Sequence, residues 1–183
     1  MGKNIITKTC YMCNSLATST EHVPPRCLFP EEKDFKGVNL RKNLLTVPSC
    51  DLHNIEKSQD DQFLMATLAG VVGNNIVGYI HTNTKVKRAL DRKKDLVNST
   101  IFNAKKITGK TIEGLKFPLL KGSPDINRLT KCFEYIAYGL YFIEYKKRFE
   151  GECSVFISFV RYKNPNLEKT KILKKKHLIR IIL

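Results

Sequence analysis

Two pairs of soft metal ligands, set far apart along the chain, constrain this sequence more than any other feature. Cys10 and Cys13 form the first pair, and Cys50 and His53 form the second with the same spacing. Ligands separated by two residues reach one ion across a tight turn, and three thiolates with one imidazole make a normal closed zinc site. We therefore expect a structural Zn²⁺ ion on these four side chains, with Cys27 as the main rival for any one position.

The residues between the two pairs predict a β-hairpin that leads into a helix. Prolines at 24 and 25 favour extended backbone after Glu21 and His22, and residues 31–42 have the charged, glycine-containing composition of a loop. Residues 43–47 then predict a second strand. Asn54 leads into a helix, and Ser58 is the predicted N-cap of that helix.

The remainder of the chain predicts a mainly helical body with a few C-terminal strands. Residues 85–96 indicate a charged helix, and 98–121 indicate strands and loops. Ser123 and Pro124 signal the start of an apolar-faced helix that we expect to end at Gly151. Residues 153–162 and 177–183 predict strands. The fold class is therefore α+β, with a zinc-stabilised motif over residues 1–62 and a basic body over 63–183, packed together as one unit.

The charge balance indicates a polyanionic partner. The 183-residue chain carries a formal net charge of +15, and nucleic acid is the commonest partner of so basic a protein. A solvated basic surface and anionic lipid are the alternatives. Among downstream basic residues, we expect four to contact phosphates: Lys85, Lys87, Arg88 and Arg92.

The sequence also predicts the compartment. Residues 1–4 carry no signal-peptide pattern, and six cysteines in such a chain are typical of a reducing compartment, so we expect a cytoplasmic protein. The longest apolar stretch, residues 63–80, is interrupted by two asparagines and three glycines. We therefore expect no membrane span.

Glu21, His22 and Asn54 form a candidate reactive set. Phosphodiester hydrolysis needs a water made nucleophilic and a metal that stabilises developing charge. A neutral imidazole accepts the proton of that water near neutral pH. A carboxylate and an amide oxygen are hard ligands that suit Mg²⁺ or Mn²⁺. Because adjacent strand residues point to opposite faces, Glu21 and His22 need a bulge or bend to serve one site.

At these residues the sequence resembles the HNH endonucleases, whose core is a ββα-metal finger. The resemblance rests on Cys10-x2-Cys13, on Glu21-His22-Val23-Pro24-Pro25, and on Val47-Pro48-Ser49-Cys50-Asp51-Leu52-His53-Asn54. It implies an endonuclease that cuts DNA, with His22 as general base, Glu21 and Asn54 on a catalytic Mg²⁺ or Mn²⁺, and structural Zn²⁺ on the two soft-ligand pairs.

The sequence departs from the family pattern at two places. His53 stands where the family usually has cysteine, and Leu45 stands where it usually has an asparagine that supports the catalytic histidine, a role for which Asn43 is the substitute. The resemblance also implies a place in bacterial antiphage defence or restriction, with a partner ATPase for some members.

Two other functions fit the same residues. One is a zinc-stabilised nucleic-acid-binding module without catalysis, and the other is an adaptor subunit whose apolar C-terminus docks a partner. Both predict that function is indifferent to His22. The joint presence of Glu21, His22 and Asn54 favours the enzyme, because a zinc knuckle alone requires none of them.

Overall fold

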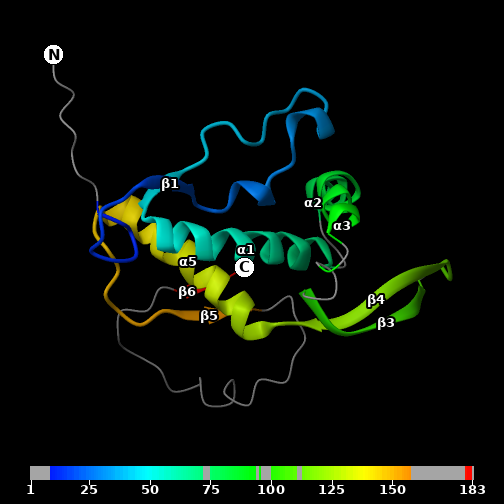
Figure 1. Cartoon of the computed structure of the whole chain (residues 1–183). Helices are drawn as coiled ribbons and strands as arrows, with labels where there is room; N and C mark the ends of the chain where they lie inside the picture. Colours follow the sequence, from blue (N-terminus) through cyan, green and yellow to red (C-terminus); the bar gives the residue numbers. More distant parts are fainter. Residues whose placement is uncertain are drawn as a thin grey trace. The chain divides into compact units, whose positions relative to one another are not determined.

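The computed structural model of this chain describes residues 9–71, 75–93, 95, 100–110, 113–157 and 180–182, with the backbone alone for 117–120 and 180–182. The described residues form a mixed α/β structure of helices and small two-stranded sheets, traced in Figure 1. They divide into two compact units, and the segments of one unit alternate along the sequence with the segments of the other. The first unit comprises residues 1–25, 44–57 and 130–183, and the second comprises 26–43 and 58–129. The predicted boundary at residue 62 falls inside helix α1 (Asp51–Ala69).

The first unit contains the expected hairpin and the start of the helix that follows it. Strand β1 (Ser19–His22) pairs antiparallel with β2 (Thr46–Ser49), and α1 begins two residues after β2 ends. Pro48 is tolerated because this sheet has only two strands, so its missing N–H breaks no interior ladder. The order strand, strand, helix predicted from the sequence is therefore confirmed.

The bounds of two of these elements differ from the prediction. The second strand was predicted over residues 43–47, but Asn43 adopts a left-handed backbone with φ 59° and lies in a turn before β2. The helix starts at Asp51, whose carboxylate interacts favourably with the helix dipole in the first turn. Ser58 is therefore an interior helical residue, and its prediction as N-cap was wrong.

Helix α5 (Ile126–Tyr145) also begins and ends away from its predicted limits. Ser123 and Pro124 are the last residues of strand β4 (Lys116–Pro124), and Asp125 caps the helix by accepting a hydrogen bond from the Arg128 amide. The predicted end at Gly151 was wrong, because the chain leaves the helix at Lys146, where φ is 55°.

Glycine at position 139 lets α5 approach the residue that follows β1. A Cβ atom built on Gly139 would lie 2.6 Å from Cγ2 of Val23, a side chain that is fully buried. In Figure 1 β1 accordingly passes beside the C-terminal end of α5. Later in this unit, strand β5 (Ser154–Phe156) pairs in parallel with β6 (Arg180–Ile182). The remaining residues of the two predicted C-terminal strands, 158–162 and 177–179 with 183, lie outside the described residues.

The second unit combines short 3₁₀ turns, helices and a long hairpin. Its turns are η1 (Arg26–Leu28) and η2 (Glu32–Asp34). Helix α2 (Ile76–His81) continues through a π-helical turn, η3 (Thr82–Val86), into α3 (Lys87–Arg92). Strand β3 (Ile101–Lys110) pairs antiparallel with β4. Four consecutive residues of α1, Phe63 to Ala66, are buried, as expected of a helix surrounded by neighbours. No helix in the described part of the chain has the length and apolar character that crossing a membrane requires.

Candidate metal centre

The four predicted zinc ligands come together in the first unit. One ligand atom from each of Cys10, Cys13, Cys50 and His53 lies within 4.8 Å of the others. The Sγ atoms of Cys13 and Cys50 are 3.8 Å apart, and Nδ1 of His53 is 3.2 Å from Sγ of Cys50 and 3.4 Å from Sγ of Cys10. Zn–S bonds of about 2.3 Å at tetrahedral angles place two sulfurs about 3.8 Å apart. The donor set and its spacing therefore fit a structural zinc ion.

Backbone hydrogen bonds hold the Cys10–Cys13 turn against β2. The Cys10 amide donates to the Ser15 carbonyl and closes the turn, while the Tyr11 amide donates to the Pro48 carbonyl. Cys50 follows β2 directly, and His53 lies in the first turn of α1. The hairpin register thus determines how the two ligand pairs face each other, although 36 residues separate them in the sequence.

The two cysteines of the first pair differ in acidity. Burial raises the pKa of the Cys10 thiol, whereas hydrogen bonds from the side chain and backbone of Ser15 lower the pKa of Cys13. A zinc ion binds both as thiolates and releases their protons on binding.

Cys27 does not belong to this cluster. Its thiol, in the second unit, donates to the Asp61 carbonyl at 3.2 Å, and burial raises its pKa to about 12. A thiol so protonated and satisfied is a poor ligand. Cys27, the predicted rival for any one ligand position, is therefore not part of the cluster.

Glu21 is buried and has one satisfied and one unsatisfied oxygen. Its Oε1 accepts hydrogen bonds from the buried Lys57 ammonium and from the Tyr11 hydroxyl. Its Oε2 is buried and has no hydrogen-bond partner among the described residues. The sequence analysis named neither Tyr11 nor Lys57 as a partner of Glu21. The signal was available in part, because Lys57 lies two helical turns after Cys50 and Tyr11 lies between the first two ligands.

His22 is the last residue of β1 and is half-buried. The β1–β2 register runs without a bulge from Ser19 opposite Ser49 to His22 opposite Thr46. In such a regular ladder Glu21 and His22 extend from opposite faces. The bulge that a shared site requires is not present in β1. Nδ1 of His22 is buried without a hydrogen-bond partner among the described residues.

Asn54 lies in the first turn of α1 and is tied to β1. Its side-chain amide donates to the Ser19 hydroxyl at 3.2 Å, which leaves its carbonyl oxygen for another partner. Asn43 is exposed and occupies the turn before β2, so it is not on the strand as predicted. Its support of His22 stays a prediction.

The four predicted phosphate-binding residues divide into two kinds. Arg88 donates to Asp34 at 2.6 Å and to Glu31 at 3.1 Å, and Lys85 lies 3.8 Å from Glu31. Lys87 and Arg92 are exposed or half-exposed on α3, and Arg92 donates to the Arg88 carbonyl. Arg88 and Lys85 thus hold the 26–43 segment within the second unit, a structural role that charge alone did not reveal.

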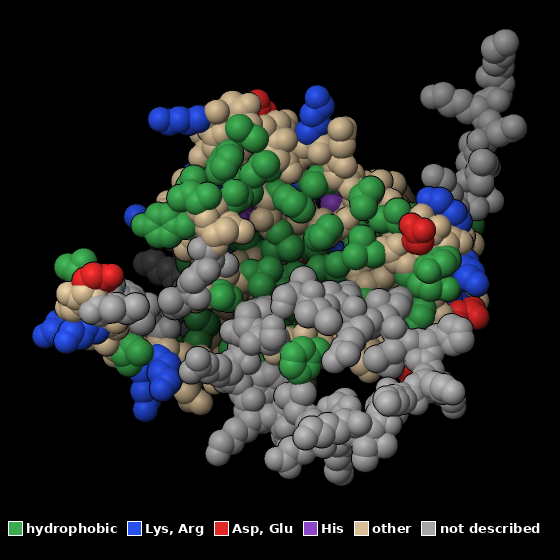
Figure 2. Space-filling model, turned by 180° about the vertical axis from the view of Figure 1, so that it is seen from behind, with side chains coloured by type: hydrophobic (Ala, Val, Ile, Leu, Met, Phe, Trp, Pro, Cys, Tyr) green, Lys and Arg blue, Asp and Glu red, His purple; other side chains and the backbone are tan. Residues whose placement is uncertain are grey.

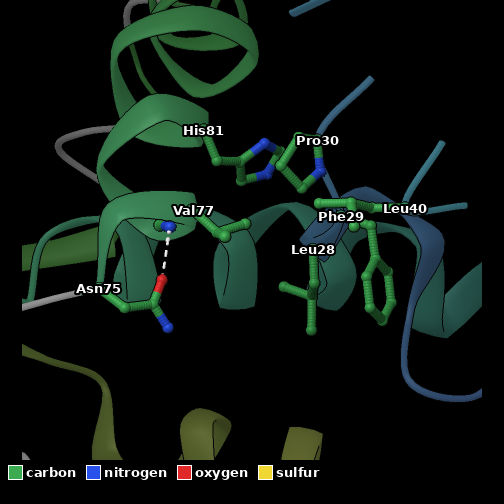
Figure 3. Close-up of a pocket in the computed structure, with 8 residues that line it drawn as sticks. Leu28, Phe29, Pro30, Leu40, Asn75, Val77 and His81 are labelled. Carbon is green, nitrogen blue, oxygen red and sulfur yellow. Dashed lines mark hydrogen bonds between the residues drawn. The ribbon is translucent and has the colours of Figure 1, made fainter. Parts of the chain in front are cut away.

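A separate hollow of about 440 Å³ lies in the second unit (Figure 3). Leu28, Phe29, Pro30 and Leu40 line one side, and Val77 and His81 of α2 line the other. The Nε2 atom of His81 hydrogen-bonds to the Cys27 carbonyl, while its Nδ1 is buried without a partner among the described residues. Burial lowers the pKa of His81, so the ring stays neutral near pH 7.

Comparison with protein families, with curated proteins and with solved structures finds no significant match to this chain. Functional assignment therefore depends on the residues and their geometry.

Proposed function

We propose that this chain is an HNH-type endonuclease that hydrolyses phosphodiester bonds in DNA. The observation that carries the proposal is the placement of His22 on a hairpin whose following helix closes a four-ligand soft-metal cluster. A histidine with a free ring nitrogen on such a zinc-stabilised strand–strand–helix unit is the arrangement expected for the base of a ββα-metal nuclease. The net charge of +15 supports a polyanionic substrate.

His22 acts in this proposal as the general base. A neutral imidazole is a suitable acceptor for the proton of a nucleophilic water. The imidazole of His22 would accept a proton from the attacking water as the water oxygen bonds to the phosphorus atom. The P–O bond to the leaving sugar oxygen breaks in the same displacement, and that oxygen takes up a proton from solvent. The backbone of β1, paired with β2 through His22 and Thr46, orients the ring.

Glu21 and Asn54 would hold the catalytic divalent ion, and this demands that Glu21 turn from the face of β1 that it occupies toward the face of His22. The unsatisfied Oε2 of Glu21 fits a cation, because a buried carboxylate oxygen without a partner carries a large desolvation cost. The carbonyl oxygen of Asn54 is a second hard ligand, as its amide is already tied to Ser19. Bound Mg²⁺ or Mn²⁺ would stabilise the negative charge that develops on the phosphate.

Plasmid cleavage with added Mg²⁺ or Mn²⁺ tests this proposal. We expect the wild type to nick or linearise plasmid DNA, and His22→Ala to lose about 10²–10⁴-fold in rate, the usual contribution of a general base. The matched control is Thr20→Ala, which changes an exposed residue of the same strand and keeps the activity. Both variants are compared at equal zinc content and equal thermal stability. Equal cleavage by wild type and His22→Ala would remove His22 from the chemistry.

A second candidate function has its own supporting observation. The buried contact of Lys57 with Glu21 already gives the carboxylate a cationic partner, and Glu21 faces away from His22. Both features suit a zinc-stabilised nucleic-acid-binding module without catalysis. Such a module binds DNA with the same affinity whether or not His22 is replaced, and it cuts DNA under none of the metal conditions above.

A further inference from the structure

The hairpin of β3 and β4 is the most basic exposed element among the described residues of the second unit. Residues 101–124 contain five lysines and a single acidic residue, Glu113, which lies in the turn between the strands. The lysines are 105, 106, 110, 116 and 121, and all five side chains are exposed. Figure 2 shows lysine and arginine side chains, in blue, gathered over this hairpin at the left of the view.

The hairpin is exposed on both of its faces. Every side chain from Phe102 to Thr108 is exposed, and successive residues of a strand point to opposite faces. Phe102 and Ile107 are 48% and 40% exposed. A two-stranded ribbon whose β3 side chains are exposed on both faces gains little stability from packing of that strand, so a bound partner would account for it.

The strand register places like charges directly opposite each other. Lys105 pairs with Lys121, and Lys110 pairs with Lys116. Like charges in such cross-strand pairs destabilise a hairpin. None of the five lysines forms an ion pair within the described part of the chain, whereas Lys85, Arg88 and Arg128 of the same unit all do. A polyanion bound along the ribbon would offset this repulsion.

We propose that the β3–β4 ribbon is the element that grips duplex DNA, lying along a groove with its lysines on the flanking phosphates. A two-stranded ribbon fits the major groove, which is about 12 Å wide. The two lysine pairs lie five residues apart on β3, or about 17 Å along the strand. Because both faces carry lysines, phosphates on both walls of a groove receive contacts. Lysine supplies point charges, so the ribbon binds without reading sequence.

This inference rests on the proposed function, since the duplex held by the ribbon is the DNA that the proposed nuclease cuts. This assignment differs from the phosphate contacts predicted for residues 85–92 of η3 and α3, where Lys85 and Arg88 are already engaged with Glu31 and Asp34.

The test measures binding of a short DNA duplex by fluorescence anisotropy at several salt concentrations, using His22→Ala throughout so that cleavage does not interfere. One protein carries Lys105, Lys110, Lys116 and Lys121 replaced by Gln. Its matched control carries four other exposed lysines replaced by Gln, namely Lys36, Lys42, Lys146 and Lys147, so both have the same net charge. Circular dichroism and zinc content establish that all three proteins are folded.

Each lost phosphate contact lowers the slope of log Kobs against log salt by about 0.9. We expect the ribbon variant to lose about 3 to 4 units of slope and about 100-fold in affinity near 100 mM salt, and the control to lose less than about 1 unit. Equal losses in the two variants, no duplex binding by the His22→Ala protein, or equal affinity for single strands would each overturn the inference.

The same proteins separate this inference from the proposed function. If duplex binding depends on the ribbon lysines while the wild type cuts no DNA with Mg²⁺ or Mn²⁺, the ribbon assignment stands and the nuclease proposal falls. If the wild type cuts DNA while the ribbon and control variants bind equally, the nuclease stands and the ribbon assignment falls.

Discussion

His53 is the residue at which the metal cluster departs from an all-cysteine pattern. Its Nδ1 lies within 3.4 Å of two ligand sulfurs, and its place in the first turn of α1 matches the two-residue spacing from Cys50. Either imidazole or thiolate completes a tetrahedral zinc site. The chemical demand at position 53 is therefore a soft donor, and more than one residue type satisfies it.

We expect His53→Cys to retain about one zinc per chain and His53→Ala to lose it. Zinc binding contributes roughly 10 kcal/mol or more to small zinc domains, so His53→Ala should lower the Tm by more than about 10 °C. Elemental analysis and a thermal melt measure both effects. Cys27→Ser is the control, since its hydroxyl preserves the hydrogen bond to Asp61, and it should keep zinc. Loss of zinc from Cys27→Ser would reassign a ligand.

Glu21 illustrates where sequence reasoning reached its limit for single residues. Its neighbours in the sequence indicated a metal ligand, and the alternation of strand residues indicated that it faces away from His22. The structure follows the alternation, and the carboxylate meets Tyr11 and Lys57, which come from two other segments. Such partners depend on how segments 10–13 and 51–57 pack, and the ligand spacing brings these segments near β1 without specifying which side chains meet Glu21.

The contact between α5 and the end of β1 depends on glycine. Ala at position 139 favours a helix by about 1 kcal/mol over Gly, but here its Cβ would overlap the fully buried Val23. The steric term is larger, because overpacking a well-filled site costs about 1–3 kcal/mol.

We therefore expect Gly139→Ala to destabilise the wild type by about 1–2 kcal/mol in urea unfolding. A Val23→Ala background removes the two γ-methyl groups at 2.6 and 2.8 Å and leaves only the Cβ of residue 23 at 3.2 Å, so the same change should be neutral or stabilising by up to about 1 kcal/mol. The sign inversion between the two backgrounds is the measured quantity. Destabilisation of equal size in both backgrounds would show that Val23 is not the cause.

The pairing of α3 with the 26–43 segment has a pH dependence of definite sign. The hydrogen bonds from Arg88 hold the pKa of Asp34 below its usual range. A carboxyl whose folded pKa is lowered stabilises the fold above its unfolded pKa of about 3.9, and this contribution disappears as the pH falls through the folded pKa.

Arg88→Gln should therefore lower the Tm by about 1–3 °C at pH 7, and this difference should shrink as the pH falls through the folded pKa of Asp34. The control is Arg92→Gln, because Arg92 lies one turn further along α3 and forms no ion pair with a carboxylate among the described residues. A Tm difference that persists undiminished into acid would show that Arg88 acts through packing instead of charge.

The boundaries of elements were harder to predict than their kinds. The hairpin, the helix after it and the strands of 98–121 were expected from proline positions, ligand spacing and glycine content. The start of α5 was missed because Ser123 and Pro124 serve β4 through pairing with residues 101 and 102, which competes with their use as a helix start. Cross-strand pairing of this kind is non-local, and a local capping signal does not contain it.

For the molecule as a whole, the sequence predicted a motif followed by a body. The structure shows two units whose segments alternate along the chain. Residues 26–43 leave the first unit between the two halves of the hairpin, and residues 130–157 return to it. The sequence carries no composition change at these points. The sequence shows the excess of lysine and arginine, but the placement of lysines opposite one another on the β3–β4 ribbon depends on a strand register that spacing alone does not specify.

The cluster at the end of the hairpin also has a consequence for redox chemistry. The Sγ atoms of Cys13 and Cys50 lie only 3.8 Å apart. An oxidant that removes two electrons therefore needs little movement of these side chains to join them as a disulfide. That bond consumes two of the four donors and prevents zinc from returning. The availability of metal and the reducing power of the surroundings therefore act on the same sulfur atoms. An oxidant that reaches the cluster competes with a zinc ion for Cys13 and Cys50.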